Sequence, residues 1–174
     1  GSAGTQTAAL GFGGQYPPVS ATYAITESWN GSSWTEVNDL NSGRRFMTGT
    51  GNSNTAALCL GGYDGSNRAN VEQWNGSSWT EVAEYNNPRG QGAASGTTST
   101  NALFFGGEPG PEGAKTEIWN GSSWTELADL ALSRSGLGGR GSTVAAIAIG
   151  GQVSPQSGTE EWNTPEANTT ITVS

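Results

Sequence analysis

The most constraining feature of this 174-residue chain is one segment that returns at a nearly fixed interval. It reads TESWNGSSWTEV from Thr26, VEQWNGSSWTEV from Val71 and TEIWNGSSWTEL from Thr116, and a shortened copy, TEEWN, starts at Thr159. The first tryptophans of the copies stand 45, 45 and 43 residues apart: Trp29, Trp74, Trp119 and Trp162. A period of this size means that one structural unit is repeated along the chain.

Each full copy predicts a β-hairpin with a tryptophan on either side of the turn. Asn30-Gly31 suits a two-residue type I′ turn, and the flanking Trp, Thr and Val residues favour strands. Such a turn makes Trp29 and Trp34 diagonal neighbours, whereas a four-residue turn places them directly opposite each other. We expect the indoles to pack between stacked sheets, and the alternative is that they stack on sugar rings. The structural tryptophans are Trp29, Trp34, Trp74, Trp79, Trp119, Trp124 and Trp162.

Two further strands are predicted ahead of each hairpin. Short apolar runs ending in Gly-Gly read as buried strands: Ala8–Gly14, Ala56–Gly62, Asn101–Gly107 and Ala145–Gly151. Segments of small residues precede three of them: Met47–Gly51, Gly90–Gly96 and Gly136–Gly141. Small residues fit where several strands crowd a common axis. Each repeat therefore holds four short strands, which is the signature of a β-propeller blade.

The repeats resemble kelch-type repeats. That pattern has a Gly-Gly after the second strand, an aromatic residue near the end of the third and a Trp on the fourth, matched here by Gly61-Gly62, Trp74 and Trp79. The resemblance covers nearly the whole chain. It implies an all-β fold: a β-propeller of four kelch-like four-stranded blades in a single domain, residues 1–174, with repeat units at about 1–40, 41–85, 86–130 and 131–174. The WNGSSWTEV motif is also similar to repeats in structural and tail-fibre-like proteins of marine phages.

How the four units close remains open between three arrangements. The chain can close as a four-bladed monomeric ring, which we favour, two chains can form an eight-bladed ring, or the chain can belong to a longer array. The last unit lacks the second Trp, and Thr169–Ser174 alternates as a strand would. That segment is expected to complete the last blade, as in a capping repeat, or to cross to the first blade and close the ring.

Composition excludes several classes of function. The net charge of −8 argues against nucleic acid and anionic membrane surfaces as partners, since both call for basic patches. We expect no membrane insertion, because no stretch approaches the length of a transmembrane helix. The chain has no His and one Cys, so we expect no metal site, no cofactor and no His-activated nucleophile. Cys59 reads as an inert buried thiol. Because the carboxylates repeat identically in every unit, we predict no catalytic residue and no enzymatic activity.

Charged residues also recur once per unit. Arg44, Arg89 and Arg134 are 45 residues apart, and a glutamate precedes the first Trp of each hairpin: Glu27, Glu72, Glu117 and Glu160. Charges repeated in this way are typical of structural ion pairs or of arginines stacked on aromatic rings. We therefore assign these arginines to the structure and not to a functional site.

The links between the second and third strand of each unit are the expected binding surface. They lie at equivalent places, so they should cluster on one face, and they vary most among the four copies. The candidate residues are Tyr16, Tyr23, Tyr63, Arg68, Glu108 and Lys115. We predict a non-catalytic module of a virion or extracellular surface assembly that binds other protein subunits. The alternative is a lectin-like propeller that binds a surface glycan.

Overall fold

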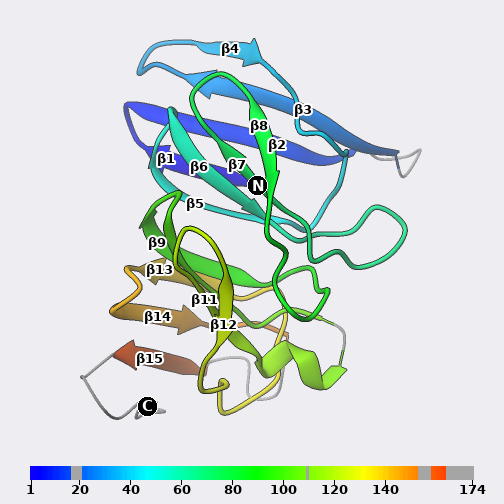
Figure 1. Cartoon of the computed structure of the whole chain (residues 1–174), viewed down its shortest axis with the longest axis vertical. Coiled ribbons are helices and arrows are strands. Elements are labelled where there is room, and N and C mark those ends of the chain that lie inside the picture. The colour runs from blue at the N-terminus through cyan, green and yellow to red at the C-terminus, as the bar shows by residue number, and fades with distance from the viewer. Residues whose placement is uncertain (17–20, 109, 153–157, 164–174) are drawn as a thin grey trace.

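The computed structural model describes residues 1–16, 21–108, 110–152 and 158–163. These residues form four antiparallel sheets in chain order, and a short 3₁₀ helix, η1 (Gly110–Ala114), is the only helix among them (Figure 1). The first sheet holds β1 (Ser2–Thr5), β2 (Ala8–Tyr16), β3 (Ala21–Trp29) and β4 (Trp34–Val37). The second holds β5 (Thr48–Ser53), β6 (Ala56–Leu60), β7 (Val71–Trp74) and β8 (Trp79–Val82). The third holds β9 (Ala93–Thr98), β10 (Asn101–Phe105), β11 (Thr116–Trp119) and β12 (Trp124–Glu126), and the fourth β13 (Gly138–Gly141), β14 (Ala145–Ile149) and β15 (Thr159–Asn163).

Each repeat unit makes one sheet, and the strands pair in the order in which they occur. The prediction of an all-β chain with a four-stranded sheet per repeat is therefore confirmed for the first three units. The fourth sheet has three strands in the described part of the chain. The strand expected at 169–174 lies outside the described residues.

The first strands of the four sheets approach one another. A hollow of about 240 Å³ is lined by residues of β1, β5, β9 and β13 together, including Gly4, Gly51 and Gly141. Small residues are required here, because a Cβ added at Gly49 would lie 2.3 Å from the Ser2 carbonyl oxygen. The expectation that small-residue strands share a crowded centre is confirmed.

The sheets follow one another as an array, with the first and fourth at the two ends of the long axis (Figure 1). Three hydrophobic clusters join the first sheet to the second, the second to the third and the third to the fourth. No such cluster joins the fourth sheet to the first within the described ranges. The favoured closed ring of four blades is thus not seen, and the propeller stays a prediction.

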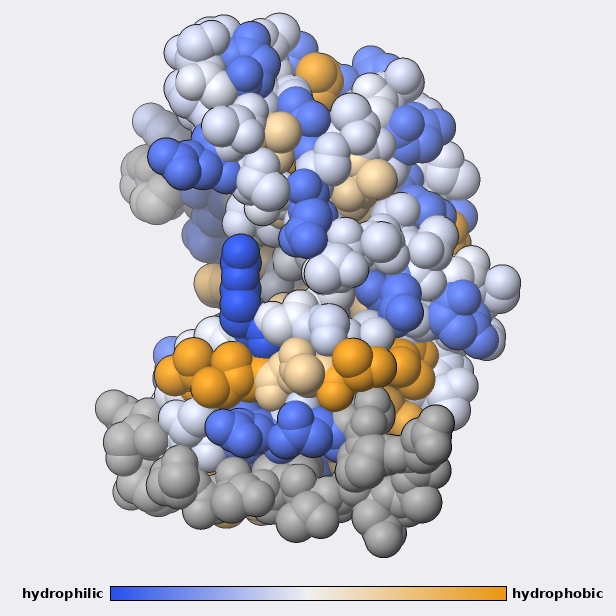
Figure 2. Space-filling model, turned by 90° about the vertical axis from the view of Figure 1, so that its left-hand side faces the viewer, coloured by the Kyte–Doolittle hydropathy of each residue, from blue (hydrophilic) through white to orange (hydrophobic). Residues whose placement is uncertain are grey.

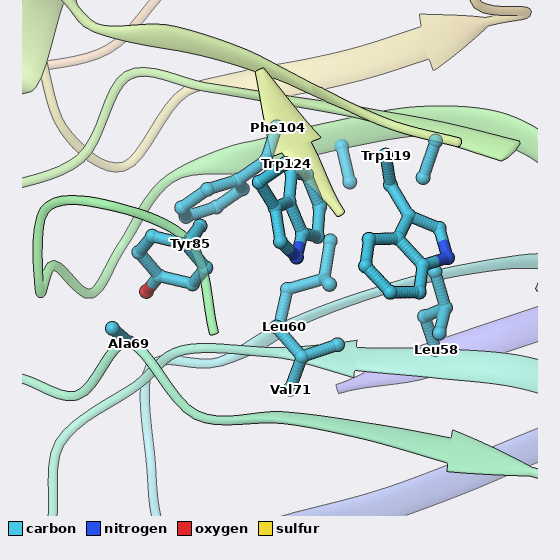
Figure 3. Packing of buried hydrophobic residues seen from close by; sticks show 10 residues of the cluster. Leu58, Leu60, Ala69, Val71, Tyr85, Phe104, Trp119 and Trp124 are labelled. Carbon is cyan, nitrogen blue, oxygen red and sulfur yellow. The ribbon is translucent and has the colours of Figure 1, made fainter. Parts of the chain in front are cut away.

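Every junction pairs two different faces. The tryptophan face of a sheet carries the hairpin indoles and the residues beside them; in the second sheet these are Ala57, Cys59, Glu72, Trp74 and Trp79. The aliphatic face is the opposite side; in the second sheet it includes Leu58, Leu60, Val71 and Val82. The aliphatic face of each sheet packs on the tryptophan face of the next. Figure 3 shows this between the second and third sheets, where Trp119 and Trp124 lie against Leu58 and Leu60.

The hairpin turn is the four-residue alternative. Trp29 pairs directly with Trp34 across β3 and β4, and their ring centroids are 5.5 Å apart. The Asn30 side chain explains the longer turn, since its Oδ1 accepts the backbone N–H groups of Ser32 and Ser33 at 2.9 and 3.0 Å. This asparagine turn competes with the two-residue type I′ turn that Asn-Gly also favours.

Replacing Asn75 with Ala is expected to lower the free energy of unfolding by about 1 kcal/mol. In the second hairpin, Asn75 Oδ1 accepts the N–H groups of Ser77 and Ser78, both at 2.9 Å. Asn75→Asp keeps an acceptor at the same place and is the matched control, which urea unfolding should place close to the unchanged protein. Equal losses in both variants would contradict this role of the side chain.

The first link differs from the expected loop. β2 and β3 are nine residues long, and pairs such as Gln15 with Thr22 and Tyr16 with Ala21 extend the ladder beyond the Gly-Gly of this unit. A register shift between Phe12 and Gly14 lets the strands continue. The link of the first unit is thus mostly strand. Its residues 17–20 lie outside the described part.

Candidate binding surface at the links

Backbone hydrogen bonds connect the segments that enter successive sheets. The N–H of Gln91 donates to the carbonyl of Phe46, and the N–H of Gly136 donates to the carbonyl of Gln91, both at 2.8 Å. Phe46 and Gln91 have φ values of 59° and 57°, a region that side-chain-bearing residues seldom adopt, whereas the third position is Gly136 with φ 64°. Strained backbone of this kind concentrates at functional sites. The backbone at Phe46 and Gln91 therefore marks a candidate site.

A hollow of about 250 Å³ lies there, and we call it the link hollow. Its lining combines a cation, two aromatic rings, amides and a carboxylate: Arg45, Phe46, Tyr63, Asn67, Gly90, Gln91 and Glu108. Reciprocal backbone bonds hold its walls, at 2.9 and 2.7 Å between Arg45 and Tyr63 and at 3.2 and 2.9 Å between Gly90 and Glu108. The link hollow is therefore built on paired backbone and not on a free loop.

Arg45 is the central group of the link hollow. Its guanidinium carbon lies 5.0 Å from the Phe46 ring centroid and 5.1 Å from that of Tyr63, so cation–π contacts orient it. Arg45 Nε is buried and donates to no acceptor in the described residues. The Phe46 ring is 48% exposed. An oriented cation beside an exposed ring suits a ligand that carries an acceptor oxygen next to an apolar surface.

The structure brings together two of the six candidate residues, since Tyr63 and Glu108 both line the link hollow. Tyr16 and Tyr23 instead contact each other on the first-sheet hairpin, with ring centroids 6.3 Å apart, and they are 54% and 39% exposed. They form a separate aromatic pair. The expectation of one common cluster is therefore not met by these two.

The last two candidates are engaged in surface ion pairs. Arg68 Nε donates to Asp64 at 2.7 Å, and this hydrogen bond lowers the pKa of the Asp64 carboxyl. Lys115 Nζ lies 2.6 Å from Glu126 and 3.5 Å from Asp129, and the bond to Glu126 raises the pKa of the Lys115 ammonium. Both charges are already partnered, so they are weaker candidates than Arg45.

Sequence reasoning missed Arg45, Phe46 and Gln91. One signal was available: Arg44 is followed by a second arginine, whereas Arg89 is followed by Gly90 and Arg134 by Ser135. The position of Arg45 thus breaks the repeat, as a site residue would. The positive φ of Phe46 and Gln91 could not be read from the residues, because neither type favours that conformation.

The three arginines that recur once per repeat unit lie outside the link hollow and form buried ion pairs with glutamates. The distances are 2.6 Å for Arg44–Glu72, 2.8 Å for Arg89–Glu117 and 2.7 Å for Arg134–Glu160, with every one of these side chains at most 4% exposed. Each glutamate also accepts a backbone N–H from the segment that enters its sheet, from Asn41, Asn86 and Ala131. These carboxylates therefore fasten the sheet to the preceding segment and are occupied by that role.

Cys59 lies fully buried on the tryptophan face of the second sheet, where Arg44 Nη2 donates to its sulfur at 3.3 Å. Burial raises the pKa of the Cys59 thiol above its ordinary value, although the charge of Arg44 acts in the opposite direction. A neutral buried thiol is a poor nucleophile, in keeping with the inert role expected from the sequence.

This raised pKa predicts a loss of stability at alkaline pH. The folded chain holds the thiol proton more tightly than the unfolded chain. The stabilisation that the protonated thiol gives the folded state is therefore complete below about pH 9 and is lost as the pH rises further. Urea unfolding near pH 8 and near pH 10 should show the loss. Cys59→Ala is the matched variant because Ala148 occupies this position in the fourth sheet. It should lose less stability over the same interval, and an equal loss would count against the thiol as the cause.

The described residues are informative about two other classes of site. They contain no group of three or more His, Cys, Asp or Glu side chains placed to hold a metal ion. They also contain no helix long and apolar enough to cross a membrane.

No family model matches the sequence, and no curated protein matches it. Among solved structures, the chain is similar to one described as "Structure of YjhT", with a TM-score of 0.70 and 13% sequence identity. The match covers 87% of this chain and 52% of that one, so this chain spans about half the length of its structural neighbour. At this identity the likeness concerns the fold alone.

Proposed function

We propose that the chain is a non-catalytic interaction module, built from propeller-type blades, that binds a partner through the link hollow. The observation that carries the proposal is the oriented Arg45 beside the exposed Phe46 ring, in a hollow that the links at Tyr63 and Glu108 help to line. Its guanidinium takes part in no ion pair within the described residues. The preferred ligand is a peptide segment of another subunit that presents a carboxylate next to an apolar side chain.

The geometry of the carboxylates supports a role without catalysis. General acid–base chemistry requires groups that can exchange protons with a substrate. Glu72, Glu117 and Glu160 are buried in ion pairs with arginine and also accept backbone N–H groups. With no His in the chain, the usual proton-transfer group is missing as well.

The proposed setting is the surface of a virion or an extracellular assembly. It follows from the similarity of the WNGSSWTEV repeats to those of phage structural and tail-fibre-like proteins, together with the acidic net charge of −8. In such a setting the module would join other protein subunits through the link hollow. Its many paired backbone groups would give it a rigid binding surface.

A glycan ligand is the second candidate, and the Tyr16–Tyr23 pair favours it. Both rings are exposed and meet edge to face, which leaves a ring face available for stacking on a sugar. On a glycan array, binding that is lost in Tyr16→Ser and kept in Arg45→Gln would assign the sugar to this pair. The absence of any bound glycan at millimolar sugar would rule the candidate out.

A displayed peptide library tests the preferred function. Peptides selected on the full chain should carry Asp or Glu beside a large apolar residue, and their affinity should fall by about 10- to 100-fold in Arg45→Gln. Arg68→Gln is the matched control, because Arg68 is more exposed yet already bound to Asp64, and it should bind as the unchanged chain does. Selected peptides that bind equally to both variants would refute the assignment.

A further inference from the structure

The two ends of the array carry unpaired faces of different kinds. We call the tryptophan face of the first sheet the start face. Its Trp34 side chain is 51% exposed. The equivalent residues of the same WNGSSWTE motif, Trp79 and Trp124, are only 5% and 9% exposed. The difference arises because no earlier sheet packs on the start face within the described residues. A large indole is thus presented to solvent at one end.

We call the aliphatic face of the fourth sheet the end face. Its Ile147 and Ile149 occupy the register positions of Leu58 and Leu60 in the second sheet. Leu60 is fully buried by the third sheet, whereas Ile149 is 49% exposed. Figure 2 shows a band of hydrophobic residues across the lower part of the molecule, where the fourth sheet lies. Arg140 and Glu161 flank Ile147 across the sheet, so the far end of the array carries an apolar strip with one charge of each sign beside it.

We propose that the end face of one copy of this chain packs on the start face of a second copy. The chain itself makes this kind of junction at each of its three internal contacts, always with an aliphatic face against a tryptophan face. The start and end faces are the two members of that pair that have no neighbouring sheet in the part of the chain that the structure describes. A second copy supplies the missing member at either end.

A specific hydrogen bond extends the argument. At the first junction, Trp79 Nε1 donates to Thr26 Oγ1 at 3.0 Å, and Thr26 stands opposite Phe12 in the first sheet. Thr159 stands opposite Ile149 in the same way on the end face, and it is half-buried. The Trp34 indole N–H has no acceptor in the described residues. In the docked pair, we expect Trp34 of one copy to donate to Thr159 of the other.

Such a contact joins unlike surfaces, so two outcomes are possible in solution. Two copies form a closed dimer if the rotation between them completes a turn, and longer chains of copies form if it does not. In both cases the link hollow stays uninvolved, because none of its lining residues belongs to the start or end face. Failure of the self-association would therefore leave the proposed function untouched, and the reverse also holds.

Light scattering and sedimentation velocity on the full chain, over a concentration series, test the proposal. The mass should rise above that of one chain, and Trp34→Gln and Ile149→Lys should each raise the dissociation constant by about 30-fold or more. Leu132→Gln is the control, since Leu132 is 44% exposed but lies in the segment between β12 and β13. A chain that stays monomeric throughout overturns the proposal, as does equal weakening by Leu132→Gln.

Mixing the two variants distinguishes unlike from like faces. Trp34→Gln keeps an intact end face and Ile149→Lys keeps an intact start face, so together they should form a one-to-one pair although each alone is monomeric. No recovery on mixing would overturn the head-to-tail geometry. The thermal unfolding midpoint of the monomer should be unchanged in both variants. A large fall for Ile149→Lys would mean that the end face is covered within its own chain, which also overturns the proposal.

Discussion

Replacing Glu117 with Gln is expected to lower the free energy of unfolding by about 3–5 kcal/mol. Glu117 Oε1 lies 2.8 Å from Arg89 Nη1, and both side chains are fully buried. The neutral amide would leave the Arg89 charge buried without a counter-charge, and it would weaken the bond to the Asn86 N–H at 2.8 Å. Urea unfolding monitored by tryptophan fluorescence measures the effect directly.

The exposed pair of the same sheet provides the control for Glu117. Lys115 and Glu126 lie 2.6 Å apart but are 26% and 45% exposed, so Glu126→Gln should change stability by less than about 1 kcal/mol. The double variant Arg89→Met with Glu117→Leu removes both buried charges and should be more stable than Glu117→Gln alone. If the double variant is the less stable of the two, uncompensated charge is not the main cause.

Replacing Trp79 with Ala is expected to lower the free energy of unfolding by about 3–5 kcal/mol, because it empties the junction between the first and second sheets. The Trp79 ring meets the Phe12 ring edge to face at 5.0 Å, and its indole N–H binds Thr26. Trp34→Ala removes the same residue from the same sequence motif, but from a side chain that is 51% exposed. Its effect should stay below about 1 kcal/mol.

This comparison isolates burial, since the two tryptophans share their neighbours in sequence and their hairpin geometry. It requires dilute protein, at which the chain is monomeric. Thermal and urea unfolding should rank the variants in the same order. If Trp34→Ala and Trp79→Ala lowered the free energy of unfolding by similar amounts, the hairpin and not the contact between sheets would be the source of the stability.

The repeat made much of the fold predictable. The spacing of Trp29, Trp74, Trp119 and Trp162 predicts the number of sheets, and the small residues near Gly49 indicate the crowded centre. The periodic arginines are expected from the sequence to be structural, as ion-pair partners or stacked on aromatic rings, and the structure pairs Arg89 with Glu117. These predictions succeeded because a repeated pattern tests each local interpretation several times along one chain.

Features that break the repeat were harder to predict. Tyr16 and Tyr23 were expected in a loop, but paired strands extend into that link because a register shift at Phe12 and Gly14 keeps the ladder going. The link hollow depends on Arg45 and on positive φ at Phe46 and Gln91, which the residue types do not signal. These properties arise from contacts between different units, and a motif read one unit at a time does not contain them.

The solvent exposure of side chains at the ends of the array could not be predicted from the sequence either. Trp34 and Trp79 stand in the same nine-residue motif, WNGSSWTEV, yet Trp34 is half exposed to solvent and Trp79 is buried. What differs is whether a sheet precedes them in space. Only the arrangement of whole sheets reveals which copy of a motif is left without a neighbour.

The uniform junction has a consequence for how such chains can change in length. Because every contact between sheets uses the same two kinds of face, duplicating one unit, such as residues 86–130, would insert a sheet that already fits both neighbours. Deleting that unit would bring together faces that are also compatible. Genes of this kind can therefore gain or lose whole modules by recombination, and compensating core mutations are needed only where buried side chains differ in size, as Cys59, Phe104 and Ala148 do at one equivalent position.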